Sequence, residues 1–238
     1  MKAGFKGFPP DGLKFLRDLK KNNRREWFQA RKEIYEERVK APMIELVGAL
    51  TGEMMKFAPD YVVEPNKALY RIYRDTRFSK DKTPYKTHVA AVFPRRGLCK
   101  TTGGGYYFHI STEEVGIGGG IYMPGPEELL AIRNHLAANY KDFEKITRAH
   151  AVRSLFGEME GEKLSRVPKG FVSNHPAAEL LKYKQFFLWK ALDLEVAATP
   201  KLFPEILKRF RAITAYLEFM NKPLTGSPQK AKEAFLGW

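Results

Sequence analysis

The residues best suited to chemistry form one dense basic row, Arg71-Ile-Tyr-Arg-Asp-Thr-Arg-Phe-Ser-Lys-Asp-Lys-Thr-Pro-Tyr-Lys-Thr-His88. Around it, residues 67–100 contain ten Lys or Arg but only two Asp, a surplus of eight positive charges. The counter-charges must therefore come from other parts of the fold, from solvent ions or from a ligand.

Side chains of these types recognise carboxylate and phosphate groups, because arginine offers planar paired donors and lysine a mobile charge. The expected ligand-binding residues are Arg71, Tyr73, Arg77, Lys80, Lys82, Tyr85, Lys86 and His88. Ion pairs that shape the pocket are expected from Arg74, Asp75 and Asp81, with Asp75 orienting the arginines. The alternative interpretation is a solvated basic edge with ordinary surface ion pairs.

Asp75 and His88 are the candidates for catalysis, as a base beside a positively charged clamp. No nucleophile elbow, Ser-x-x-Lys motif or paired-carboxylate motif accompanies them. The simpler role for Asp75 is that of a counter-ion for Arg71 and Arg77.

Neither a metal nor a cofactor is expected. The five histidines lack a short paired spacing and Cys99 has no cysteine partner, although His88 and His109 could converge from two predicted strands. The glycine clusters at 103–105 and 118–120 are not followed at once by a helix with Lys-Ser/Thr, as a phosphate-binding loop requires. Glycines inside a strand indicate instead a bulge or a group pressed against the backbone.

Strand alternation sets the expected positions of the basic residues. If residues 69–78 form a strand, Tyr70, Ile72, Arg74, Thr76 and Phe78 face the core, and Leu69, Arg71, Tyr73, Asp75 and Arg77 face the other side. Turn-forming residues and Pro84 predict a loop at 79–85. Further strands are expected at 86–93, 106–111 and 115–123, and their short connections favour an antiparallel meander.

Helical spacing of apolar residues precedes and follows this sheet. Helices are expected over about 11–21, 24–39, 42–57, 126–143, 142–156 and 203–220, and residues 185–189 have strand composition. The order of elements predicts an α+β fold, an antiparallel β-meander with N-terminal and C-terminal helices packed on it. No repeat or long linker interrupts the chain, so residues 1–238 are expected to form a single domain.

Composition narrows the setting. With 238 residues and 44% apolar content, the chain can bury a core without disulfides. One cysteine fits a reducing compartment, so a cytoplasmic location is expected, and no apolar run approaches the length of a membrane span. A net charge of +14 favours a small anionic ligand or nucleic acid as partner. The sequence indicates no oligomeric state.

The basic row also resembles the central signature of the family catalogued as domain of unknown function 2461. Three further stretches fit it: Asn22-Asn-Arg-Arg-Glu-Trp-Phe28, Gly118-Gly-Gly-Ile-Tyr-Met-Pro124, and Pro168-Lys-Gly-Phe171 followed by His175-Pro176. The resemblance runs from about Phe8 to about Leu224. It implies one conserved domain and supplies no catalytic residues, because the family has no assigned activity.

Three functions remain open at this stage. The preferred one is binding of a phosphate- or carboxylate-bearing ligand at residues 71–88. The second is a metal-independent enzyme acting on such an anionic substrate. The third is a nucleic-acid-binding or structural interaction protein that uses a sheet edge or the tail ending in Trp238.

Overall fold

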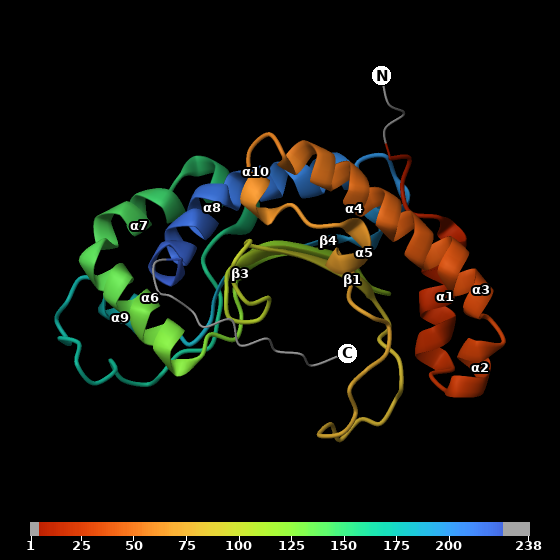
Figure 1. Cartoon of the computed structure of the whole chain (residues 1–238), viewed down its shortest axis with the longest axis horizontal. Helices are drawn as coiled ribbons and strands as arrows, with labels where there is room; N and C mark the ends of the chain where they lie inside the picture. Colours follow the sequence, from red (N-terminus) through yellow and green to blue (C-terminus); the bar gives the residue numbers. More distant parts are fainter. Residues whose placement is uncertain (1–4, 226–238) are drawn as a thin grey trace.

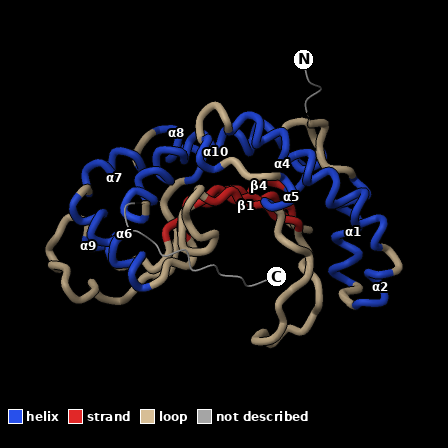
Figure 2. The backbone as a smooth tube through the Cα atoms, in the orientation of Figure 1, coloured by secondary structure: helices blue, strands red, loops and turns tan. Residues whose placement is uncertain are grey.

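The computed structural model describes residues 5–225. The tail proposed as a contact through Trp238 lies outside these described residues. Figures 1 and 2 show helices at the N-terminal side, a central sheet, and further helices that return across it. This arrangement is the predicted α+β fold, with helices packed on an antiparallel sheet.

Helices precede the sheet in the first third of the chain. They are α1 (Pro10–Lys21), α2 (Arg25–Gln29), α3 (Lys32–Tyr35), the π-helix η1 (Glu36–Lys40), α4 (Ala41–Met54), the 3₁₀ turn η2 (Pro59–Tyr61) and α5 (Pro65–Ala68). The second helical group is α6 (Pro126–Ala138), α7 (Tyr140–Thr147), α8 (His150–Phe156), α9 (Ala178–Leu181), η3 (Leu194–Ala198), α10 (Leu202–Asn221) and η4 (Lys222–Leu224). None of the helices described is long and apolar enough to cross a membrane.

The sheet has the strand order β1-β2-β3-β4, and all neighbours are antiparallel. Its strands are β1 (Val89–Pro94), β2 (Gly105–Ile110), β3 (Glu114–Ile121) and β4 (Phe186–Asp193). Short connections join the first three strands, residues 95–104 between β1 and β2 and residues 111–113 between β2 and β3. The segment with strand composition at 185–189 joins as an edge strand, after a long excursion through α6–α9.

The first face of the sheet packs against helices. Phe93, Tyr106 and Phe108 are buried there, and the Phe210 ring of α10 lies 4.8 Å from Tyr106 and 5.6 Å from Phe93, centroid to centroid. Figure 1 shows α4 and α10 crossing this face. Burial of these large rings supplies much of the hydrophobic stabilisation, at about 25 cal/mol per Å² of apolar surface.

A buried polar contact closes one end of this core. Asn221 is fully buried; its side-chain oxygen accepts from Gly104 N–H at 2.7 Å, and its amide donates to Gly104 C=O at 3.0 Å and to Tyr61 Oη at 2.9 Å. The end of α10 is thereby fixed to the start of β2. Every one of these groups would cost free energy if left unpaired away from water.

The second face of the sheet carries no such helical layer in the described structure. Strand register places on it Ala90 and Val92 of β1, Tyr107 and His109 of β2, Gly116 and Gly118 of β3, and Trp189 of β4. We call these residues the open face. Figure 1 shows α1–α3 at one end of this face and α6 with α9 at the other.

The predicted strand at 69–78 is wrong. This segment makes only isolated bridges, Leu69 with Ala91 and Tyr73 with Tyr85, and the rest of residues 71–88 projects as a loop (Figure 1). Of the expected core face, Ile72 is buried but Phe78 is 95% exposed. Alternation of side chains needs a surface to bury against, and the loop extends past the sheet and its helices.

Candidate anion-binding site

The base of the projecting loop is fixed by two contacts to the N-terminal helices. Asn23, in the turn between α1 and α2, accepts from Tyr85 N–H at 3.0 Å and donates to Tyr85 C=O at 2.9 Å. Phe28 of α2 stacks on the Tyr85 ring at 4.1 Å. Two of the sequence stretches that carry the family resemblance, residues 22–28 and 71–88, therefore contact each other. This contact holds the base of the loop in place. Tyr85 is only 2% exposed, and we therefore leave it out of the binding site proposed below.

Several basic groups of the loop are held by the loop itself. Arg77 donates to Asp75 at 3.1 and 2.8 Å, and these hydrogen bonds lower the pKa of the Asp75 carboxyl to about 2. Arg74 pairs with Asp81, whose pKa also falls to about 2, and donates to Thr83.

The remaining loop residues are spread out. Lys82 donates to the backbone oxygen of Thr76 at 2.8 Å, and Lys80 is exposed. The Tyr73 ring lies 5.4 Å from the Tyr85 ring and is half exposed. The tip of the loop therefore does not gather its charges into one pocket. The simpler role expected of Asp75 is that of a counter-ion for both Arg71 and Arg77. Within residues 5–225 it pairs with Arg77 and not with Arg71.

Three other cations converge where the loop meets the sheet. The Nζ atom of Lys86 lies 5.0 Å from the centre of the Tyr70 ring, and Nζ of Lys100 lies 4.4 Å from the same centre. Arg71 directly follows Tyr70 in the sequence and lies close enough to Lys86 for its charge to act on that lysine. We call Arg71, Lys86 and Lys100 the cation cluster. In the described part of the chain, none of its members forms an ion pair with a carboxylate.

The electrostatics of the cluster are unfavourable without a counter-ion. Burial lowers the pKa of Lys86, and the charge of Arg71 lowers it further. Burial likewise lowers the pKa of Lys100, with the charge of Lys86 adding to the effect. Two unit charges about 9 Å apart, the largest separation that the contacts with Tyr70 allow, repel by roughly 2 kcal/mol at an effective dielectric constant near 20. An anion bound here would relieve that repulsion.

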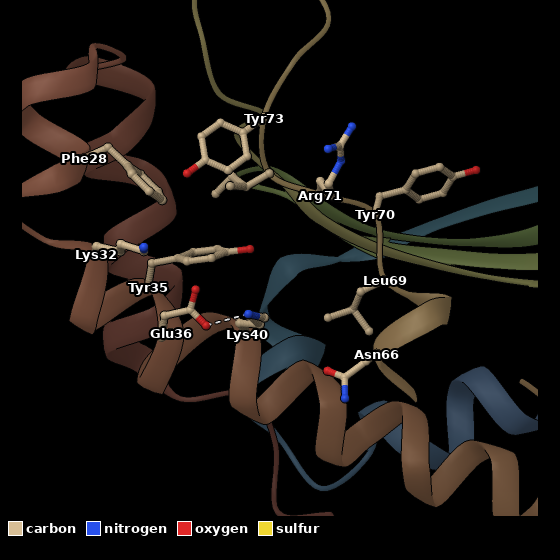
Figure 3. Close-up of a pocket in the computed structure, with 11 residues that line it drawn as sticks. Phe28, Lys32, Tyr35, Glu36, Lys40, Asn66, Leu69, Tyr70, Arg71 and Tyr73 are labelled. Atoms are coloured by element: carbon tan, nitrogen blue, oxygen red, sulfur yellow. Dashed lines mark hydrogen bonds and ion pairs between the residues drawn. The ribbon is translucent and has the colours of Figure 1, made fainter. Parts of the chain in front are cut away.

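A pocket of about 260 Å³ opens beside the cluster, between the N-terminal helices and residues 66–73. Figure 3 shows Phe28, Tyr35 and Leu69 around it, with the Glu36–Lys40 ion pair at its floor. The Arg71 side chain points away from that ion pair. Within the pocket, Glu36 therefore neutralises the charge of Lys40, whereas Arg71 on the rim has no carboxylate partner among the described residues.

The cluster continues into the open face through aromatic rings. Tyr70 lies 6.2 Å from Tyr107, and Tyr107 lies 5.9 Å from Trp189. The Trp189 ring packs directly on the bare backbone of β3: a Cβ added at Gly116 would come within 2.2 Å of it. The expected close approach to the glycines of this strand is therefore made by the indole of the neighbouring strand.

A row of hydrogen-bonding groups lies next to these rings. His109 has its Nε2 3.4 Å from Glu114 Oε1 and its Nδ1 3.3 Å from Tyr107 Oη. Burial lowers the pKa of His109 to about 4, so the ring is neutral at pH 7. We assign the proton to Nε2, facing the carboxylate, which leaves Nδ1 to accept from the tyrosine.

The two histidines do converge, with His88 lying 5.5 Å from His109, ring to ring. Burial lowers the pKa of His88 to about 4, helped by the charge of Lys86. Asp75 is paired with Arg77 in the loop, and no group of three or more His, Cys, Asp or Glu among residues 5–225 is placed to hold a metal ion.

The comparison with known families agrees with this sequence signature. The model described as "Conserved hypothetical protein (DUF2461)" matches residues 11–219, which is most of the chain. The chain belongs to the DUF2461 family. Among curated proteins, none matches it. Arg71 and Lys86 stand near the two ends of the central stretch that carries the family resemblance, whereas Lys100 lies outside that stretch but within the matched residues.

Sequence reasoning missed three residues of this site. Strand alternation predicts Tyr70 in the core, Lys100 enters only the charge count over residues 67–100, and Trp189 is only the last residue of the segment with strand composition. The strand alternation of residues 106–111 did carry a signal, since it put Tyr107 and His109 on one face.

Proposed function

We propose that this protein binds a small ligand through a phosphate or carboxylate group, held by Arg71, Lys86 and Lys100. One observation carries the proposal: Lys86 and Lys100 meet at a single tyrosine ring, with Arg71 close enough for its charge to act on Lys86, and none of the three has a carboxylate partner in the described residues. Burial lowers the pKa of both lysines. Charge-assisted hydrogen bonds from such groups are stronger than neutral ones. We place this binding in the cytoplasm, on the ground of the single, exposed cysteine.

The proposal differs from the site expected at the loop tip. There, Arg77 and Arg74 each face an aspartate, and Tyr85 is in the core. A groove tracking a nucleic-acid backbone would need those arginines for phosphates rather than for aspartates, and would need the Tyr85 ring at the surface for stacking. The cation cluster is compact by comparison, which favours a single anionic group over a polymer.

The discriminating experiment compares two arginines of the same segment. Isothermal titration of pyrophosphate into the full chain is expected to show a loss of affinity of about tenfold for Arg71→Gln, since hydrogen bonds from a charged group are worth roughly 1.5–3 kcal/mol. Arg77→Gln, whose guanidinium faces Asp75, serves as the matched control and is expected to stay within about twofold of the parent protein. A larger loss for Arg77→Gln than for Arg71→Gln would place the site at the loop tip instead.

A metal-independent enzyme is the second candidate, favoured by the Glu114–His109–Tyr107 row beside the cluster. Tyr107 would take a proton from the bound ligand while passing its own to His109 Nδ1, and Glu114 would stabilise the resulting imidazolium. On this hypothesis, His109→Gln abolishes any turnover of an anionic substrate and leaves pyrophosphate affinity unchanged. Turnover that survives the substitution at every pH would remove His109 from the reaction.

A further inference from the structure

We propose that the ligand carries a planar ring beside its anionic group, and that the ring lies on Tyr107 and Trp189 of the open face. This inference rests on the anion-binding function proposed above and names the class of ligand. A mononucleotide has the required chemistry, with one phosphate and one flat heteroaromatic base. The argument has three steps: a surface for the ring, its position relative to the cations, and the length of the ligand.

The open face is flat beside Trp189 because the neighbouring strand has glycines there. Gly116 and Gly118 present no side chains on the open face, and Trp189 lies against their backbone, where a Cβ at either position would come within 2.2 to 2.9 Å of its ring. The indole and the Tyr107 ring are both partly exposed, although each is a large aromatic group on a sheet. Aromatic rings held in place on a strand are the surfaces on which bases stack, because every base offers a π-face.

The aromatic rings of the open face lie next to the cation cluster. Tyr70 contacts both lysines of the cluster, and the next ring, Tyr107, lies 6.2 Å from it. Trp189 follows at 5.9 Å from Tyr107. Positive charge and aromatic surface are therefore parts of one continuous region, and a ligand that fills both must be anionic at one end and flat at the other.

The spacing suits a single sugar unit between the two ends. In a mononucleotide the sugar separates phosphate from base by about the length of the step from Tyr70 to Tyr107. His109 faces the same side of the sheet, with its ring 5.4 Å from Trp189, so the base would also lie near a neutral imidazole ring. A ligand that has only an anionic group would not contact the Tyr107 and Trp189 rings.

Three probes separate the two parts of the ligand: AMP, ribose 5-phosphate and adenosine, each titrated into the full chain by calorimetry. AMP is expected to bind at least about tenfold more tightly than ribose 5-phosphate, from base–aromatic stacking. Adenosine, which lacks the charge, is expected to bind more weakly than either. Tyr107→Leu is expected to abolish the advantage of AMP while leaving ribose 5-phosphate unchanged.

Matched variants keep the test sharp. Tyr107→Phe retains the ring and loses only the hydroxyl contact with His109, so it is expected to preserve the preference for AMP. If Tyr107→Leu does not fold, Trp189→Leu is expected to reduce the same preference, with Trp189→Phe restoring most of it.

The outcomes distinguish this inference from the function it rests on. Equal affinity for AMP and ribose 5-phosphate, both lowered by Arg71→Gln, overturns the ring site and leaves the anion site standing. If neither phosphate binds but pyrophosphate does, the ring site is overturned and the anion site stands; if pyrophosphate does not bind either, both are overturned. A preference for AMP that Tyr107→Leu and Trp189→Leu leave intact places the ring elsewhere and overturns the assignment to the open face.

Discussion

The double substitution Lys86→Gln and Lys100→Gln is expected to abolish measurable pyrophosphate binding and to leave the fold intact. Each lysine offers a charged donor, and loss of two such contacts lowers affinity by roughly 100-fold or more. In the free protein the change removes the mutual repulsion of the two ammonium groups as well as their contacts with Tyr70. These effects oppose each other, so the free energy of unfolding is expected to change by less than about 1 kcal/mol.

Thermal melting with and without pyrophosphate measures both effects at once. The parent protein is expected to melt at a higher temperature with the anion, because a ligand that binds only the folded state stabilises it. The double variant is expected to melt near the parent's anion-free temperature under both conditions. Lys145→Gln, an exposed lysine on α7, controls for the loss of general positive charge and is expected to keep the full shift.

Gly118→Ala is expected to destabilise the sheet strongly, although it adds only one methyl group. A Cβ at this position would lie 2.2 Å from the backbone oxygen of Leu188, so β3 and β4 would have to separate. Because a backbone atom cannot swing aside, we expect a cost of about 3 kcal/mol or more, at the upper end of overpacking effects. For a chain of this size that lowers the melting temperature by roughly 6–12 °C, which circular dichroism would show.

Gly52→Ala is the matched control for this prediction. Gly52 lies inside α4 with nothing within 4 Å of its hypothetical Cβ, and alanine there favours the helix by roughly 0.5–1 kcal/mol. The control should therefore melt slightly above the parent. If Gly118→Ala melted as the control does, β3 and β4 would not approach as closely as the structure shows.

Most elements of the fold could be predicted from local patterns. The helical spacing at 43–57 and 203–220 and the strand alternation at 106–111 each follow from burial of one face, and the structure has α4, α10 and β2 at these places. The order of helices, strands and helices then gave the α+β class. These predictions succeed because neighbours in sequence suffice to decide them.

The strand at 69–78 failed for a physical reason. Its alternation is real, since Ile72 is buried and Arg71 exposed, but a strand also needs a partner with a continuous ladder of hydrogen bonds. Here the returning segment contains Pro84, which has no N–H to donate, and pairing breaks into isolated bridges. Whether a segment finds a continuous hydrogen-bonding partner depends on residues elsewhere in the chain, so the pattern within residues 69–78 does not reveal it.

The anion site proposed here lies beside the loop tip, whereas the sequence alone predicts it at the tip. The surplus of positive charge in residues 67–100 located the region, but which cations stay unpaired depends on where the aspartates reach. Asp75 lies two residues from Arg77, so this local pair was foreseeable. Lys100 meets Tyr70 only because the turn after β1 returns to the start of the loop, and nothing in the spacing of these residues reports that contact.

The pKa values of Lys86 and Lys100 test the central claim most directly, and NMR titration of their ¹³Cε resonances would measure both. In the free protein we expect both pKa values to lie below the ordinary lysine value of about 10.4, because the ammonium groups are partly buried next to other cations. Addition of pyrophosphate should raise both pKa values. Ordinary pKa values for both lysines that do not respond to the anion would contradict an anion-binding site at the cation cluster.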